Sequence, residues 1–134
     1  MTANGQERPR EIRFEALGAD APRSFRAFLP ADLIHFDGHF PEFPLLPGVT
    51  QLASVVVPLA RRAFPGLGAV QKLRRVRFRR PIGPDQTIVV TLSRAELRVA
   101  FEIAIEGEPR EVASTGTVEF RSDAPDAPDA PGSP

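Results

Sequence analysis

The sequence has no cysteine, no tryptophan and no tyrosine, and only two of its 134 residues are histidine. Without cysteine, disulfide bonds, thiolate nucleophiles, cysteine-bound zinc and iron–sulfur clusters are all excluded. No run approaches the ~18 consecutive apolar residues of a transmembrane helix. The polar start MTANGQERPREIRF lacks the apolar segment of a secretory signal. These absences predict a soluble protein of the cytoplasm that does not work in a membrane.

A net charge is also absent, because 17 basic residues balance 17 acidic ones. Such a chain has no overall attraction to nucleic acid or to anionic membranes, so any electrostatic recognition must be local. Apart from Phe78, which the strand alternation turns inward, no aromatic residue is interleaved with the basic residues, and we expect no nucleic-acid surface. The densest basic set is either a solvated strand face or a docking surface for an acidic carrier; its members include Arg61 and Arg62 and, on a predicted strand, Arg75, Arg77 and Arg79.

The length of 134 residues and the 42% hydrophobic content fit a single domain. We place this domain at residues 11–121, after a flexible tail at residues 1–10. Residues 122–134 repeat Asp-Ala-Pro, and this acidic, proline-rich composition predicts a disordered tail.

Within the domain, the hydrophobic pattern changes from helical to strand-like near residue 68. Residues 49–64 are mostly apolar and lie between Pro47-Gly48 and PGLG, which predicts one largely buried helix with a kink at Pro58. Apolar and polar residues then alternate in four consecutive stretches, which predicts an antiparallel meander. The stretches are residues 72–82, 87–94, 97–107 and 110–121, and two further extended stretches precede the helix at 11–17 and 24–29. Together they predict an α+β fold in which an antiparallel sheet wraps around one helix.

The stretch HFPEFPLLPGV at residues 39–49 fixes a histidine among three prolines and a Pro-Gly turn. His39-Phe40-Pro41, Pro44 and Pro47-Gly48-Val49 stand at the spacing of the motif of the hotdog-fold β-hydroxyacyl-[acyl carrier protein] dehydratases, which this chain resembles over about residues 11–121. The longer form HFPEFPLLPGVTQL is most similar to the branch that acts in aryl-polyene biosynthesis.

The resemblance implies a hotdog fold and a dimer. It also implies a 3-hydroxyacyl thioester, carried by acyl carrier protein or coenzyme A, as substrate in a fatty-acid or polyketide type of synthesis, and no cofactor.

Dehydrating such a thioester requires a base for the proton beside the carbonyl, an acid for the departing hydroxyl, and a donor for the thioester oxygen. A neutral imidazole suits the first task because its ordinary pKa lies near working pH. By resemblance, His39 is the base and the backbone amide of Gly48 is the donor. Substrate-contacting positions implied by the motif are Phe40, Pro47 and Val49.

The acid that the resemblance places fourteen residues after the histidine is missing, because position 53 is alanine. No aspartate or glutamate occurs between Glu42 and Asp85. The neighbouring alcohols and amide are far too weak as acids to replace a carboxyl group; they are Thr50, Gln51 and Ser54. Losing a general acid typically costs roughly 10²–10⁴-fold in rate.

Two interpretations of Ala53 stay open. The chain is a dehydratase that works slowly with His39 alone, or it is a non-catalytic subunit that binds thioester or carrier and pairs with an active dehydratase. In the family each site takes its histidine from one chain and its acid from the other, so a homodimer would lack the acid in both sites. A heterodimer with an acid-bearing hotdog protein would hold one complete site. An acyl thioesterase is a weaker alternative, because hotdog thioesterases also generally use a helix carboxylate.

A metal site was considered for HFDGH at residues 35–39, because His-x-Asp begins the facial triad of some iron oxygenases. That triad needs a second, distant histidine, and the only two histidines here are four residues apart. We therefore expect no metal.

Overall fold

The computed structural model describes residues 12–18, 23–31 and 46–122. The predicted N-terminal tail, residues 123–134 of the predicted C-terminal tail, and the segment that carries His39 and Phe40 lie outside these ranges. Ser122, which we assigned to the C-terminal tail, is the last residue of strand β7 (Glu111–Ser122).

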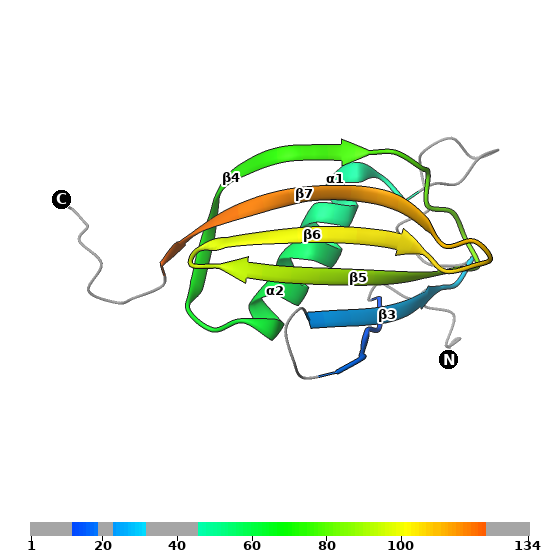
Figure 1. The fold of residues 1–134 in the computed structure, drawn as a ribbon, viewed down its shortest axis with the longest axis horizontal. Coiled ribbons are helices and arrows are strands. Elements are labelled where there is room, and N and C mark those ends of the chain that lie inside the picture. The colour runs from blue at the N-terminus through cyan, green and yellow to red at the C-terminus, as the bar shows by residue number, and fades with distance from the viewer. Residues whose placement is uncertain (1–11, 19–22, 32–45, 123–134) are drawn as a thin grey trace, which may run out of the picture.

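The structure contains a six-stranded antiparallel sheet, and one helix runs across its inner face (Figure 1). The strands lie in the order β2-β3-β5-β6-β7-β4, so β2 and β4 form the two edges. Their bounds are β2 Glu15–Ala16, β3 Arg23–Leu29, β4 Leu67–Phe78, β5 Gln86–Ala95, β6 Arg98–Ile105 and β7 Glu111–Ser122. The predicted α+β architecture, a sheet curved around one helix, is confirmed.

The helix consists of three consecutive segments, α1 Gly48–Thr50, η2 Gln51–Val56 and α2 Val57–Ala63. The middle segment is π-helical, and the Val57 amide donates to the Leu52 carbonyl five residues earlier. This wider turn lies directly before Pro58, which has no amide hydrogen and whose ring crowds the carbonyl four residues earlier in an α-helix. The irregularity expected at the proline therefore takes the form of a π-helical turn.

The prediction of a four-strand meander is wrong for its first strand. Strands β5, β6 and β7 pair in sequence, but β4 pairs with the far side of β7, and β3 occupies the place beside β5. The chain between β4 and β5 crosses the end of the sheet, where the amides of Arg79 and Arg80 donate to the Ala113 carbonyl. The buried Ile82 also binds this connection to the start of the helix.

The core lies between the helix and the inner face of the sheet. On the helix, Gln51, Val55, Val56, Leu59 and Ala60 are buried. In β3 the buried residues alternate with exposed ones, as a strand with one covered face requires. The sheet side of the core includes Phe25, Leu29, Ile88, Val90, Leu92, Phe101, Ile103, Val118 and Phe120.

Candidate active site at the start of the central helix

The helix begins at Gly48 without a side-chain cap, because its N-cap residue is Pro47. The first amides of a helix have no carbonyl partner within it, so the Gly48 amide is available to an external acceptor by position. Leu46, two residues earlier, is held in place because its amide donates to the Ile82 carbonyl at 2.7 Å. The structure thus places two predicted site residues, Pro47 and Gly48, at a fixed entry to the helix.

Gly48 packs directly against the ring of Phe78 at the end of β4. A Cβ atom at position 48 would lie 2.8 Å from the tip of that ring, which is too close for a side chain without movement of the phenyl group. Phe78 therefore turns towards the helix, as the strand alternation predicted, and its register partner Ser114 is completely buried. The ring itself remains 51% exposed.

Ala53 and Val49 share the exposed side of the same helix start. Val49 is 73% exposed, and Ala53 one turn later is exposed too. The side chain at position 53, where the motif predicts an acid, is therefore accessible on the surface of the described structure.

Gln51 points the opposite way and is buried. Its side-chain amide donates to the Leu46 carbonyl at 3.0 Å and its oxygen accepts from the Ser114 hydroxyl at 2.9 Å. The sequence showed Gln51 only as a weak candidate to replace the acid, and neither this contact nor the one between Gly48 and Phe78 was foreseen. The sequence signal was weak, because Gln51 is one of several polar residues on a mostly apolar helix.

His39 and Phe40, the base and one substrate contact of the sequence analysis, lie outside the described residues. Their roles stay predictions, as do those of Gly48, Pro47 and Val49. Among the residues that the structure describes, no group of three or more acidic or histidine side chains is placed to hold a metal ion.

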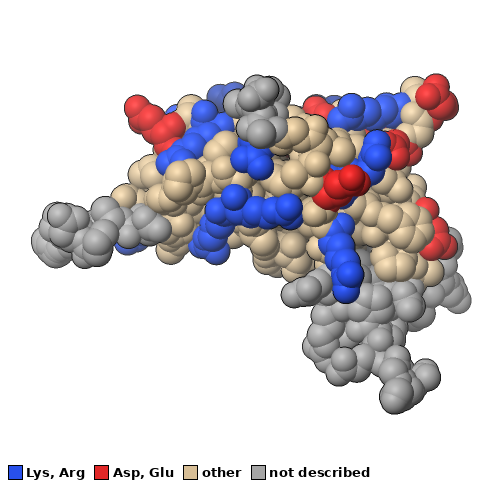
Figure 2. All heavy atoms as spheres, turned by 90° about the horizontal axis from the view of Figure 1, so that it is seen from below, with Lys and Arg blue, Asp and Glu red and all other residues tan. Residues whose placement is uncertain are grey.

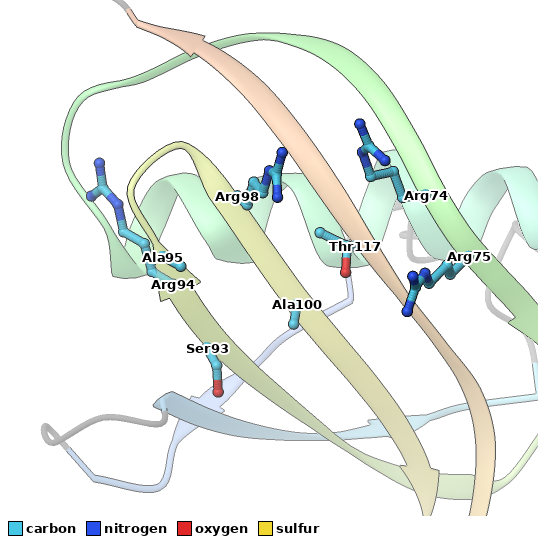
Figure 3. A pocket seen from close by; sticks show the side chains of 8 residues that line it. All are labelled: Arg74, Arg75, Ser93, Arg94, Ala95, Arg98, Ala100 and Thr117. Atoms are coloured by element: carbon cyan, nitrogen blue, oxygen red, sulfur yellow. The ribbon is translucent and has the colours of Figure 1, made fainter.

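Arginines from three strands, Arg74 and Arg75 of β4, Arg94 of β5 and Arg98 of β6, line a pocket of about 430 Å³ on the outer face of the sheet, opposite the helix (Figure 3). Small side chains that face one another across β5, β6 and β7 leave room for this pocket. A β-bulge at Arg75, which has a φ of 54°, brings two successive arginines to this rim. The lining residues are Arg74, Arg75, Ser93, Arg94, Ala95, Arg98, Ala100 and Thr117.

Three of the arginines that line this pocket already have ion-pair or hydrogen-bond partners. Glu119 forms ion pairs with Arg74 and, at 3.3 Å, with Arg98. Arg94 donates to the backbone carbonyls of Glu96, in the turn after β5, and of Pro65, between the helix and β4. The predicted docking residues Arg75, Arg77 and Arg79 are exposed and form no ion pair with any residue that the structure describes.

Basic side chains also occur elsewhere on the molecule. Figure 2, which views the molecule from the side of β3, shows them across the middle of the face and acidic side chains mostly towards the ends. Positive charge alone therefore does not single out β4.

A curved antiparallel sheet around a central helix that starts at a Pro-Gly turn defines a hotdog-fold protein of the dehydratase type. The dehydratase domain of the polyketide PpsC from Mycobacterium tuberculosis shares this fold, with a TM-score of 0.64 at 20% identity over 89% of this chain and 46% of that one. The chain is also similar to the dehydratase heterocomplex ApeI:P from Xenorhabdus doucetiae, with a TM-score of 0.68 and 28% identity over 86% of this chain and 100% of that one.

The model of the ApeI-like family, described as ApeI dehydratase, matches residues 19–117. The chain belongs to this family, which confirms the resemblance to the hotdog dehydratases. A curated relative is the 3-hydroxyacyl-[acyl-carrier-protein] dehydratase FabZ of Thermus thermophilus, 35% identical over 92 residues. That match covers 60% of this chain and 65% of the relative, so less than two thirds of the relative's length is represented. In the part of the chain that the structure describes, no helix is long and apolar enough to span a membrane.

Proposed function

We propose that this chain supplies the histidine half of a dehydratase site that acts on 3-hydroxyacyl thioesters carried by acyl carrier protein or coenzyme A. The observation that carries the proposal is Ala53. It stands where the family motif expects the acid, and its side chain is exposed beside the Pro-Gly entry of the helix. The pathway we propose is of the fatty-acid or polyketide type, with aryl-polyene synthesis as the specific case, in the cytoplasm.

In the proposed reaction His39 removes a proton from the carbon beside the thioester carbonyl. The electron pair becomes the new carbon–carbon double bond, and the bond from the neighbouring carbon to its hydroxyl breaks. The Gly48 amide stabilises the charge that develops on the thioester oxygen. The hydroxide must gain a proton to leave as water, and this chain has no carboxyl group at the position that would donate it.

We infer that the missing acid comes from a second hotdog subunit in a heterodimer. The inner face of β4 presents apolar side chains that the helix leaves exposed; Val70 is 40% and Leu73 is 45% exposed. Their register partners on β7, Phe120 and Val118, are buried, so both pairs share the inner face. The opposite edge of β4 pairs with no described strand. An uncovered apolar strip beside a free strand edge favours edge-to-edge pairing, and the similar ApeI:P structure is a heterocomplex.

Replacing Leu73 with lysine should weaken this pairing about tenfold or more, because the apolar contact would enclose an unpaired charge. Analytical ultracentrifugation measures the dissociation constant of the heterodimer that the wild-type or variant protein forms with an acid-bearing hotdog protein. The matched control is Leu17→Lys, since Leu17 is 43% exposed but lies next to β2, at the other edge. Equal weakening by both changes would contradict an interface at β4.

We also propose that an acidic carrier docks on Arg75, Arg77 and Arg79. Replacing Arg75 and Arg77 together with glutamate should lower kcat/KM about tenfold for a carrier-bound thioester and leave it unchanged for the same acyl group on a small thiol. Kinetics in low and high salt check this, because the loss should shrink as salt screens the charges. An equal loss for both substrates would show that these arginines do not act in docking.

Ala53 also supports a second candidate, a non-catalytic subunit that binds thioester or carrier and stabilises an active partner. Interconversion of crotonyl and 3-hydroxybutyryl thioesters separates the two functions when the chain is paired with an acid-bearing hotdog protein. A rate that falls in the pair when His39 is replaced by alanine supports the catalytic proposal. A rate that is indifferent to His39 supports the non-catalytic candidate.

A further inference from the structure

Gln51 and Ser114 are the two buried polar side chains among the described residues, and they are bonded to each other. Gln51 is 4% exposed and Ser114 is completely buried. Such groups are costly to bury unless their hydrogen bonds are satisfied. Both ends of the Gln51 amide have a partner, so this polar contact is complete inside an otherwise apolar core.

The two partners fix which way the amide faces. The Leu46 carbonyl can only accept, so it requires the NH₂ end of Gln51, whereas the Ser114 hydroxyl can donate or accept. Turning the amide around would set two oxygens against each other at Leu46. The Leu46 contact therefore selects glutamine over glutamate, which has the same shape but offers no donor when ionised.

The contact links three parts of the fold. Ser114 lies on β7, Gln51 on the first turn of the helix, and Leu46 within the histidine motif, directly before Pro47. Leu46 is held from both sides, because its amide donates to Ile82 while its carbonyl accepts from Gln51. Gly48 follows two residues later, and the Gln51 backbone amide donates to the Pro47 carbonyl at 2.9 Å.

We propose that Gln51 is a positioning residue that holds Leu46 and Pro47, and through them the Gly48 amide, in a fixed orientation against the sheet. The inference rests on the proposed function for its catalytic consequence, since the group positioned is the proposed oxyanion donor. We call the pair of hydrogen bonds that holds Leu46, from its amide to Ile82 and from Gln51 to its carbonyl, the Leu46 clamp. This clamp is a property of the fold, so it can be tested without measuring activity.

Hydrogen exchange measured by NMR tests the clamp directly. In Gln51→Leu the Leu46 carbonyl loses its donor, and exchange at the Leu46 amide should rise about tenfold or more relative to the Ile103 amide in the central strand β6. The control is Val55→Ala, which removes packing from the same buried helix face but no hydrogen bond at Leu46. An unchanged ratio in Gln51→Leu, or an equal rise in Val55→Ala, would overturn the clamp.

A pH series on Gln51→Glu adds a readout that lost packing does not produce. Burial beside a carbonyl oxygen disfavours the carboxylate, so the pKa of the introduced carboxyl group lies higher in the folded chain than in the unfolded chain. Stability should therefore be lowest above the folded-state pKa and recover as the pH falls through it, because the protonated acid can donate to Leu46. Gln51→Leu should show no such recovery. A Gln51→Glu profile that matches the Gln51→Leu profile would contradict the assigned orientation.

The catalytic consequence is measured in an Ala53→Glu background. There Gln51→Leu should lower kcat about tenfold or more with a smaller change in KM, whereas Val55→Ala should leave kcat of the folded protein unchanged. Equal kcat values for the two would overturn the positioning role. If the Ala53→Glu protein is itself inactive, the proposed function fails, and the exchange and pH results still decide whether Gln51 holds Leu46.

Discussion

Replacing Ala53 with glutamate is expected to raise the rate of 3-hydroxyacyl thioester dehydration by the isolated protein roughly 10²–10⁴-fold, the range that a positioned general acid contributes. The side chain at position 53 is exposed on the helix, so a carboxyl group fits there without repacking the core. It would protonate the departing hydroxyl, the step for which the wild-type chain has no group at this position. Steady-state kinetics with 3-hydroxybutyryl and crotonyl thioesters measure the gain in either direction.

Two variants control this result. In the double variant Ala53→Glu, His39→Ala the gain should disappear, because the acid has no base to act with. In Ser54→Glu the carboxyl group sits on the neighbouring residue of the π-helical turn, at a partly buried position with a different direction, and no gain is expected. A gain in Ser54→Glu equal to that in Ala53→Glu would show that any added charge suffices and that position 53 is not the acid's place.

Replacing Phe25 with alanine should destabilise the fold by about 3–5 kcal/mol, the usual cost of removing a buried phenyl ring. Phe25 is completely buried on β3, and the guanidinium groups of Arg23 and Arg62 lie 5.5 and 5.1 Å from its ring centroid. Arg62 belongs to the last turn of α2, so its contact with the Phe25 ring also stabilises the packing of the helix end on the sheet. Domains of this kind are stable by roughly 5–15 kcal/mol in total. Urea denaturation of the two proteins measures the loss.

The matched control lies three residues further along the same strand. Phe28 is 54% exposed on the outer face, and Phe28→Ala should change the stability by only about 0.5 kcal/mol or less. Similar losses for Phe25→Ala and Phe28→Ala would mean that β3 does not turn a single face to the helix.

The periodic parts of this fold were predictable from the sequence. The helix expected at 49–64 is observed at 48–63, and the strands from residue 87 onward begin and end within two residues of their predicted bounds. Strand alternation and Pro-Gly turns are local signals. They predicted the elements correctly where one face of a strand is covered. The partner of β4 was not predictable in this way, because short connections favour pairing between neighbours along the chain. In the structure β4 instead pairs with the far side of β7, and the connection to β5 buries Ile82.

Within the site, the motif identified the helix entry, and counting along it identified Ala53. The contacts that hold the entry were not predictable, since they join residues distant in sequence. Gln51 and Ser114 are 63 positions apart, and the ring on Gly48 comes from Phe78 at the far end of β4. Arg75 shows the same limit: its place on the outer rim depends on a positive φ that no periodicity reveals.

The central claim is that this chain contributes a histidine to a site that is completed by an acid on another chain. Mixing the wild-type protein with the double variant Ala53→Glu, His39→Ala tests it most directly, after unfolding and joint refolding so that dimers form at random. Each protein alone lacks one of the two groups in every site, but a mixed dimer has His39 from one chain facing the introduced glutamate of the other. We predict that the mixture dehydrates 3-hydroxybutyryl thioester at about a quarter of the Ala53→Glu rate per chain, because half of the dimers hold one complete site of two. An inactive mixture alongside an active Ala53→Glu protein would contradict a site shared between two chains.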